Sequence, residues 1–190
     1  MQSKEGRISK MPNWTTNELH IEPDWVSNQD KAKEEFIKFK DENIKLDIDN
    51  ASSETTGEAS FSFKTMLPIP KELEIEKSTS DESETLQAIN KEKYGYESWY
   101  EFCIEKWGTK WDAAEPYIIE SSEDVLIIRF ETAWSPPLGW LEEASKKYKR
   151  LLFRMNVSEE SNAFIGQPIA RGGNLLANIC RVDYPDGYDG

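Results

Sequence analysis

Histidine and cysteine are scarce in this sequence of 190 residues, which has one histidine and two cysteines. His20, Cys103 and Cys180 are too few and too far apart in sequence to suggest a zinc-ligand cluster. Secreted scaffolds held by disulfides normally carry more cysteines, so we expect both thiols to be reduced and buried. The shortage predicts no metal, no cofactor and no catalytic residue, and therefore a protein that is not an enzyme.

Long hydrophobic runs are also missing. No apolar stretch approaches the roughly 20 residues that a membrane-spanning helix needs. Residues 1–10 are polar and lack the apolar segment of a signal peptide. These features predict a protein that does not bind membranes and stays in the cytoplasm of the cell that makes it.

Positive charge is in short supply. Lys and Arg number 23 against 36 Asp and Glu, which gives a net charge of -13. A chain of this charge repels phosphate backbones and anionic lipid, so we expect no direct binding of nucleic acid. The same charge favours a partner protein with a basic surface, or serves only to keep the protein well solvated.

The first half of the chain shows weak but readable patterns. Leu19 and Ile21 alternate with polar neighbours and predict a strand. A helix that Ser27 or Asn28 caps should follow and end near residue 43, and alternation at residues 61–64 predicts a second strand. Residues 71–84 suggest a loop or a frayed helix start. The apolar stripe expected on the first helix is Ala32, Phe36 and Phe39.

The second half has clearer signals. Ser98 and Glu101 form a capping-box pattern that predicts a helix start, and Gly108 is placed to end that helix. Residues 125–130 and 151–157 predict strands, and a further strand is expected from Phe164 to the turn at Gly172 and Gly173. Between them, Ser135 followed by two prolines predicts a second long helix. The stripes expected on these helices are Trp99, Phe102, Cys103 and Trp107, and then Trp140, Leu141, Ala144 and Tyr148.

This order of elements is that of a ferredoxin-like, or split βαβ, α+β fold. Removing one insertion leaves strand, helix, strand, strand, helix, strand, which forms an antiparallel sheet with helices on one face. We expect a single domain over residues 11–180 with the insertion at about 71–115. Residues 1–10 read as a flexible basic extension and residues 181–190 as an acidic tail.

Several motifs resemble those of the YubB-like ferredoxin-like proteins of phages, prophages and plasmids. The most specific are Trp-Gly-Thr-Lys-Trp at residues 107–111 and Thr-Ala-Trp-Ser-Pro-Pro at residues 132–137, and Met-Pro-Asn-Trp at 11–14 also agrees. The chain departs from the pattern in its N-terminal extension, in Thr15 where such proteins often have Cys, and in an acidic insert near residues 78–84. The resemblance implies the fold and a mobile-element origin, but no activity and no catalytic residue.

The acidic segments around residues 41–58 and 72–84 are the candidate partner-binding surface. Carboxylates on such a surface can replace nucleic-acid phosphates in a basic groove of a partner protein, and the alternative is that the segments are merely solvated. Carboxylates are numerous enough that a site for a hard cation also stays open. The residues assigned to this surface are Asp41, Glu42, Asp47, Asp49, Glu54, Glu58, Glu72, Glu74, Glu76, Asp81, Glu82 and Glu84.

The aromatic and basic residues have competing interpretations. Most of the seven Trp residues fall beside helical stripes and are expected in the core, although a base-stacking surface is an alternative. His20 is expected to face solvent or a helix end. The candidate aromatic residues are Trp99, Trp107, Trp111, Trp134 and Trp140. The candidate phosphate-binding residues are Arg129, Arg154 and Arg171.

Two functional hypotheses follow. The first is a phage or mobile-element accessory protein that inhibits a host protein, such as an antiviral defence component, by binding it. The second is a nucleotide or small-molecule binder, or an enzyme acting on a nucleotide signal, in which Arg129, Arg154 or Arg171 meets a phosphate. The sequence leaves the oligomeric state open, a homodimer included.

Overall fold

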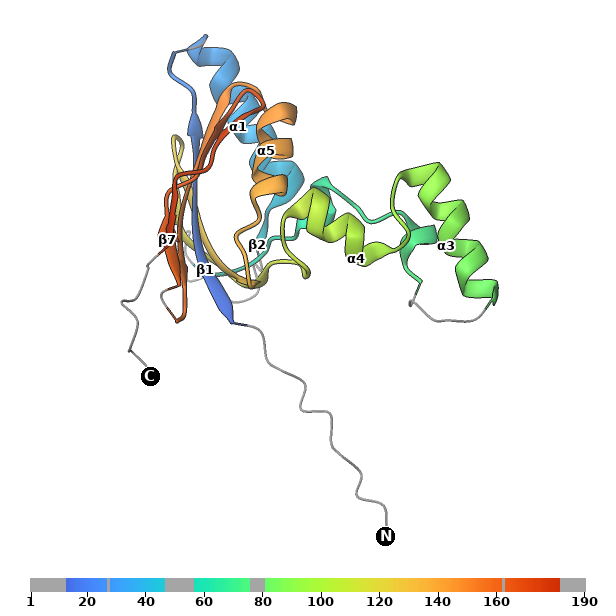
Figure 1. Cartoon of the computed structure of the whole chain (residues 1–190). Coiled ribbons are helices and arrows are strands. Elements are labelled where there is room, and N and C mark those ends of the chain that lie inside the picture. The colour runs from blue at the N-terminus through green and yellow to red at the C-terminus, as the bar shows by residue number, and fades with distance from the viewer. Residues whose placement is uncertain (1–12, 27, 47–56, 76–80, 162, 182–190) are drawn as a thin grey trace, which may run out of the picture.

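The structure, a computed structural model, describes residues 13–26, 28–46, 57–75, 81–161 and 163–181. Figure 1 shows a twisted sheet with α1 and α5 lying against one of its faces and α3 and α4 projecting away from it. The helices are α1 (Gln29–Asn43), α2 (Phe63–Met66), η2 (Lys71–Leu73), α3 (Asp81–Tyr94), α4 (Trp99–Phe102), the π-helical turn η3 (Cys103–Trp107) and α5 (Leu138–Lys147).

The strands of the described residues form one antiparallel sheet. They run in the order β10-β7-β6-β1-β5-β4-β3-β2, with β8 pairing β6 and β9 pairing β8. The bounds are β1 (Trp14–Pro23), β2 (Lys45–Leu46), β3 (Gly57–Ser60), β4 (Ala114–Ser121), β5 (Leu126–Ala133), β6 (Leu151–Glu159), β7 (Phe164–Gly166), β8 (Ile169–Arg171), β9 (Asn174–Leu176) and β10 (Ile179–Arg181).

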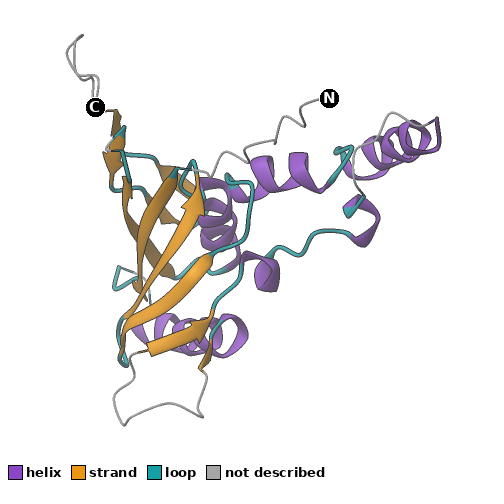
Figure 2. Cartoon of the chain, turned by 90° about the horizontal axis from the view of Figure 1, so that it is seen from below, coloured by secondary structure: helices purple, strands orange, loops and turns teal. Residues whose placement is uncertain are grey.

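The ferredoxin-like arrangement expected from the sequence is confirmed. Its central strands are β6, β1, β5 and β4, and its two covering helices are α1 and α5. Because β1 pairs antiparallel with both β5 and β6, and β5 with β4, the split βαβ order is complete. Residues between α1 and β4 supply the projecting helices, which Figure 2 shows well to one side of the strands.

The strand expected at residues 61–64 is wrong. Phe61 precedes the short helix α2, and the second strand of the ferredoxin-like unit is instead β4, which the sequence reading missed. The alternation of Phe61 and Phe63 arises because Ser62 caps α2, accepting a hydrogen bond from the Lys64 amide, while both rings are buried. Short apolar alternation therefore indicated burial but not strand conformation.

Strand β1 shows why the sheet buries one face. Its residues alternate strictly between half-buried and buried, so Leu19 and Ile21 point toward the helices. Asn28 caps α1 by accepting from the Lys31 amide, as expected, and the helix ends at Asn43. In the described residues, the core is formed by side chains of the sheet and of the helices that cover it. These side chains include Phe36, Phe39, Phe130, Trp140, Phe153 and Met155.

Two predicted caps are corrected. Ser98 makes no capping hydrogen bond, and the Glu101 carboxylate accepts from the Glu97 amide at 2.8 Å instead of completing a capping box. Ser135 does not cap α5, whose first residue follows Pro137. Gly108 does end its helix in a left-handed conformation, with φ 86°. The sequence thus located these helix ends but not the bonds that hold them.

The C-terminal part of the sheet has more strands than expected. Residues expected to form one strand from Phe164 onward divide into β7 and β8, and β9 and β10 follow them. Gly172 and Gly173, with φ 56° and 86°, form the turn between β8 and β9, as predicted. Cys180 on β10 is exposed, so the expectation that both cysteines are buried is wrong for this one.

Candidate functional site

The acidic surface expected from the sequence is only partly covered by the described residues. Four of its members, Asp47, Asp49, Glu54 and Glu76, lie outside them. The side chains of Glu58, Asp81 and Glu82 are likewise outside what the structure describes. The described members are Asp41 and Glu42 on α1, Glu72 in η2, Glu74 just after it, and Glu84 on α3.

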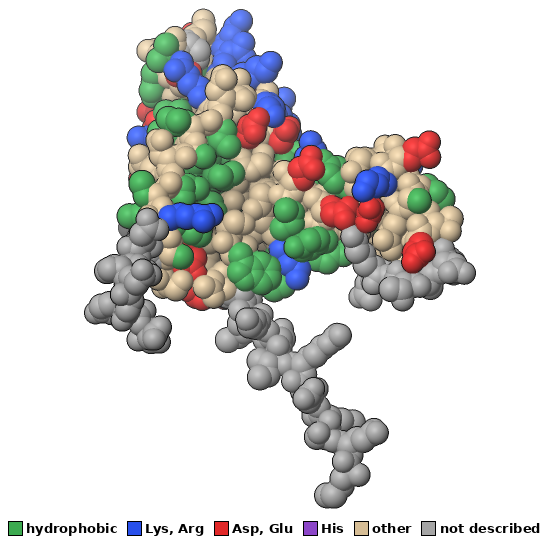
Figure 3. Space-filling view, viewed as in Figure 1, with side chains coloured by type: hydrophobic (Ala, Val, Ile, Leu, Met, Phe, Trp, Pro, Cys, Tyr) green, Lys and Arg blue, Asp and Glu red, His purple; other side chains and the backbone are tan. Residues whose placement is uncertain are grey.

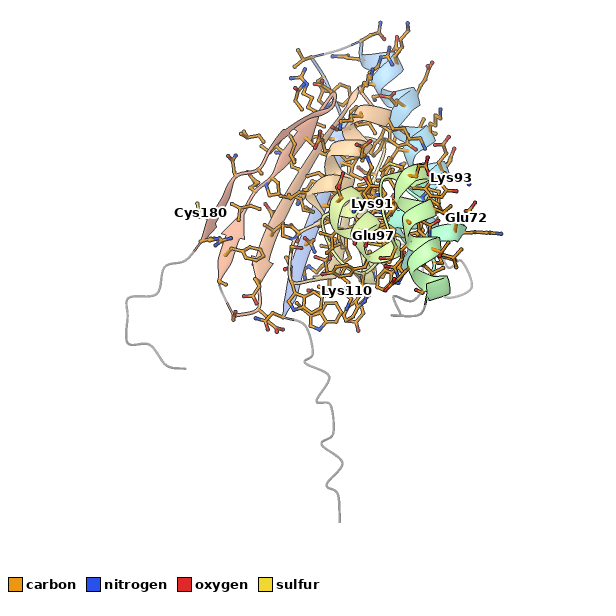
Figure 4. All side chains as sticks on the ribbon, turned by 45° about the vertical axis from the view of Figure 1, so that its right-hand side comes forward. Glu72, Lys91, Lys93, Glu97, Lys110 and Cys180 are labelled. Carbon is orange, nitrogen blue, oxygen red and sulfur yellow. The ribbon has the colours of Figure 1, made fainter. Side chains whose placement is uncertain are left out.

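These described carboxylates are distributed over separate elements. Glu42 accepts a hydrogen bond from the Tyr148 hydroxyl at 2.6 Å and pairs with Lys147, and its pKa is lowered first by the tyrosine bond. Glu72 pairs with Lys93 on the projecting helix α3 at 3.1 Å (Figure 4). Its pKa falls to about 2, first through a backbone hydrogen bond. Both carboxylates therefore have partners within the chain, and the acidic-surface hypothesis stays a prediction.

The tryptophans divide between core and surface, which corrects the expectation that Trp111 and Trp134 belong to the core. Trp107 and Trp140 are buried, but Trp111 is 38% exposed and Trp134 is 45% exposed. Tyr100, also 45% exposed, lies near them because all three rings surround Lys110. We call Trp14, Tyr100, Lys110, Trp111 and Trp134 the tryptophan patch.

The three tryptophan rings of the patch are in contact through Trp111. The Trp111 ring centre lies 5.5 Å from that of Trp134 and 6.1 Å from that of Trp14. The Lys110 ammonium lies 5.0 Å from the Trp111 ring centre and 5.4 Å from that of Trp134, within the range of cation–π attraction. Figure 3 shows hydrophobic side chains gathered at this lower edge of the body, and Figure 4 places Lys110 there.

Trp134 is held in a strained backbone conformation. Its φ is 65°, and Glu115 with φ 49° is the other residue with positive φ, glycines aside, in the described part of the chain. The Thr132 hydroxyl donates to the Ser135 carbonyl at 2.8 Å, and the Asn17 amide donates to Thr132 from beneath. Such strain persists only where neighbouring bonds fix it, and it concentrates at functional sites.

The loop that carries Lys110 and Trp111 is tied to the same strand end. The Thr109 hydroxyl donates to the Ala133 carbonyl at 3.0 Å, and the Ser135 hydroxyl donates to the Gly108 carbonyl at 2.6 Å. On its other side, Asp112 accepts from the Ser62 hydroxyl and the Phe63 amide at the start of α2. These bonds present Trp111 and Trp134 together on a rigid support.

A pocket opens beside the tryptophan patch. Its volume is about 310 Å³, and we call it the glutamate pocket because it has three carboxylates and, among its described lining residues, no lysine or arginine. Trp14 belongs to both the pocket and the patch, so the two form one continuous surface. The lining residues are Trp14, Thr16, Ala114, Glu115, Glu131 and Glu160.

The carboxylates of the pocket repel one another. Burial raises the pKa of Glu131 above its usual value, and the charges of Glu115 and Glu160 raise it further. A hydrogen bond from Thr16 at 3.2 Å and the charge of Arg129 oppose the rise. The pocket therefore concentrates negative charge.

The backbone of Glu115 is unusual. This residue lies at an irregularity in the β4–β5 register and precedes Pro116, a position where helical and left-handed backbone is disfavoured.

The basic residues weighed as phosphate contacts already have acidic partners. Arg129 pairs with Glu18 at 2.9 Å, Arg154 with Glu22 at 3.1 Å, and Arg171 with Asp24 at 2.6 Å. His20 is half-buried and lies 2.9 Å from Glu18. The hydrogen bonds of His20 and Arg129 lower the pKa of Glu18. The helix-free face of the sheet thus has a network of balanced charges.

The remaining candidate features are a reactive thiol, a metal site and a membrane-spanning helix. Cys103 is buried, and burial raises the pKa of its thiol to about 12. Across the described part of the chain, no three His, Cys, Asp or Glu side chains are arranged to hold a metal ion. None of the helices in the same residues has the length and apolar content to cross a membrane.

The glutamate pocket was missed by the sequence reading, and the patch was misread. Trp111 and Trp134 are 23 positions apart in the printed sequence, and only the contact between the loop and the end of β5 brings them together. A usable signal did exist, because both lie in the motifs at residues 107–111 and 132–137. Glu115, Glu131 and Glu160 lie among so many carboxylates that no sequence pattern separates them.

A family model that matches part of the chain agrees with the ferredoxin-like fold. Residues 106–185 match a family model described as a ferredoxin-like domain in Api92-like protein. Among solved structures, the protein api92 from Yersinia pseudotuberculosis aligns with 92% of this chain and 99% of its own, at 8% identity and a TM-score of 0.48. Among curated protein sequences none matches. The matched segment contains the elements from β4 to β10, and the loop and the strand end that carry Lys110, Trp111 and Trp134.

Proposed function

We propose that the chain is a binding protein whose working surface is the tryptophan patch, and that it acts by occupying a surface of a host protein. The observation that carries this proposal is the set of exposed rings of Trp111 and Trp134, which contact one another at a tilt beside Trp14. Trp and Tyr are the residues most enriched at the energetic centres of protein interfaces. An exposed aromatic cluster of this kind marks an interaction site.

The strained backbone supports the same proposal. A left-handed Trp134 reduces the stability of the fold, yet a network of hydrogen bonds from Asn17, Thr132 and Ser135 maintains it. Trp134 is 45% exposed, so the free chain leaves much of its apolar surface uncovered. Its presentation to a partner accounts for the arrangement.

The finer form of the proposal is an accessory protein of a phage or another mobile element that inhibits a host defence protein. Its support is the resemblance of residues 107–111 and 132–137 to proteins of such elements, and the net charge of -13, which favours a basic partner. In this form no residue of the chain performs chemistry. The alternative of a nucleotide-binding protein gains no support from Arg129, Arg154 or Arg171, since each has an acidic partner.

The test is capture from host-cell lysate with the immobilised chain and its Trp134→Gly variant. Glycine adopts a positive φ freely, so the backbone turn is kept while the ring is lost. Loss of a central interface tryptophan costs about 2 kcal/mol or more, which weakens binding roughly 30-fold. We expect the wild-type chain to retain a specific protein, identified by mass spectrometry, and the variant to lose it.

Trp25→Ala is the matched control, because Trp25 is 43% exposed but lies beyond the opposite end of β1. It should capture the same protein as the wild-type chain. The proposal fails if the wild-type chain retains no specific protein, or if Trp134→Gly retains the protein as well as Trp25→Ala does.

A further inference from the structure

The tryptophan patch and the glutamate pocket form a single surface with two chemical characters. Trp14 lines the pocket and also contacts Trp111. A ligand bound on the rings can therefore also contact the carboxylates of the pocket. The backbone fixes this junction, because the Trp134 amide donates to the Asn13 carbonyl at 2.9 Å and the Glu160 amide donates to the Trp14 carbonyl at 3.0 Å. Both halves of the surface are therefore positioned by the same strand end.

The rings of the patch already attract a cation. Within the chain itself, the Lys110 ammonium lies over Trp111, Trp134 and Tyr100 at 5.0, 5.4 and 5.9 Å from the ring centres. Aromatic faces carry negative charge density, and tryptophan attracts cations most strongly among the aromatic residues. The geometry of the patch is thus one that holds a positive group.

The pocket has the complementary charge for a cation and no cation of its own among its described lining. Glu115, Glu131 and Glu160 converge there, and the hydroxyl of Thr16 donates a hydrogen bond to Glu131. The partial burial of Glu131, followed by repulsion from the charges of Glu115 and Glu160, raises its pKa. A positive group entering the pocket would relieve this repulsion, whereas a phosphate or carboxylate would increase it.

We propose that the tryptophan patch and the glutamate pocket bind a positively charged segment of a partner protein, with one lysine or arginine side chain entering the pocket. This inference rests on the proposed function and specifies the partner's chemistry. The apolar stem of such a side chain lies against Trp14, and its charged end meets Glu131 and Glu115. It places the acidic recognition surface at residues other than the acidic segments singled out from the sequence.

The test uses the full chain and a short peptide in which arginine alternates with glycine. The comparison peptides replace arginine with citrulline, which has nearly the same shape without the charge, or with glutamate. Binding is followed by NMR through the indole N–H signals of Trp14, Trp111 and Trp134, assigned by single Trp→Phe substitutions. We expect saturable shifts at Trp14 with the arginine peptide, and binding at least about fivefold weaker for both comparison peptides.

Substitutions test whether the carboxylates of the glutamate pocket bind the arginine side chains. Glu115→Gln combined with Glu131→Gln should weaken the arginine peptide by about fivefold or more, because the pocket loses negative charge without losing shape. Glu92→Gln is the matched control on the projecting helix, since Glu92 is exposed there. This control should bind the arginine peptide as the wild-type chain does.

Several outcomes would overturn the inference. They are equal binding of the arginine and citrulline peptides, unchanged affinity in the double variant, and absence of any saturable shift at Trp14. Binding that appears only when Lys4, Arg7 and Lys10 are all changed to Gln would assign the pocket to the chain's own basic residues and also overturn it. None of these outcomes bears on Trp134-dependent capture from lysate, so the proposed function stands or fails separately.

Discussion

At the scale of single residues, Trp134 and Glu115 share an unusual property. Both have positive φ, a conformation that costs an L-residue with a side chain roughly 1–2 kcal/mol. Trp134 lies in the tryptophan patch and Glu115 lines the glutamate pocket, so both strained positions border the same surface. The strain is therefore concentrated where side chains must be aimed outward.

Glu131 gives a prediction at this scale. Because its pKa is raised in the folded chain, first by burial, the folded state holds a proton more tightly than the unfolded state does. Stability must then increase as the pH falls through the folded-state pKa toward the lower pKa of the unfolded state, and the ionised carboxylate opposes folding at neutral pH. Glu131→Gln should accordingly raise the melting temperature at pH 7.5 by roughly 1–3 °C.

The pH dependence of this effect is its control. Below about pH 4, the carboxyl is protonated in both states, so the variant and the wild-type chain should melt together. Glu92→Gln removes the same charge from an exposed position and should leave the melting temperature at pH 7.5 nearly unchanged. A lower melting temperature for Glu131→Gln at pH 7.5 would contradict the assignment.

At the scale of elements, the support of the tryptophan patch depends on how η3 meets α5. Gly139 is in the first turn of α5, and a Cβ there would lie 2.8 Å from the carbonyl oxygens of Glu105 and Lys106. Gly108 allows a similar approach, since its Cβ would lie 2.9 Å from the Leu138 amide nitrogen. The two elements pack backbone to backbone, which fixes the start of the loop that carries Lys110 and Trp111.

Gly139→Ala should therefore destabilise the chain even though alanine favours helices. The higher helix propensity contributes about 1 kcal/mol, but overpacking against backbone costs about 1–3 kcal/mol, and the rigid carbonyls place this site at the upper end. We expect the melting temperature to fall by roughly 2–6 °C in thermal unfolding followed by circular dichroism. An unchanged or higher melting temperature would show that η3 can move away from α5 without cost.

The projecting helix α3 behaves as a separate element. Its Leu86 and Ile89 are 43% and 52% exposed, and Figures 1 and 2 show it away from the sheet. Its attachment includes the Asn90 amide donating to the Glu72 carbonyl and the ion pair of Lys93 with Glu72. Exposed ion pairs contribute at most about 1 kcal/mol, so the helix is weakly anchored.

At the scale of the whole molecule, the aromatic core joins the inserted segment to the ferredoxin-like unit. Phe63 of α2 and Trp107 of η3 lie 5.7 Å apart, and Phe63 also contacts Phe130 of β5 and Trp140 of α5. All four side chains are buried. Residues 61–67 and η3 should therefore unfold together with the sheet, whereas α3 can open alone.

Hydrogen exchange tests this division. Amides of α3 should exchange through local opening at least about 100-fold faster than those of β1, which require global unfolding. Amides of η3 should be protected like β1, because Trp107 belongs to the shared core. Exchange of α3 as slow as that of β1 would show that the projecting helix is part of the same cooperative unit.

The sequence by itself determined the elements whose signals are local. Alternation around Leu19 and Ile21 specified β1, Asn28 specified the start of α1, and Gly108 specified the end of η3, because each depends on neighbours along the chain. The predicted ferredoxin-like order was right, but it took residues 61–64 as its second strand, whereas that strand is β4. Strand β4 was missed because Glu115, Pro116 and Glu120 interrupt its apolar residues, and its pairing with β5 decides its conformation.

Only the tertiary structure decided which residues form the proposed binding surface, which consists of the tryptophan patch and the glutamate pocket. Trp111 and Trp134 read as core aromatics until folding placed both at the exposed end of the sheet. Among the many carboxylates of an acidic chain, only spatial convergence distinguishes Glu115, Glu131 and Glu160. The physical reason is that exposure, charge repulsion and ring stacking depend on distances across the fold, which no spacing along the chain specifies.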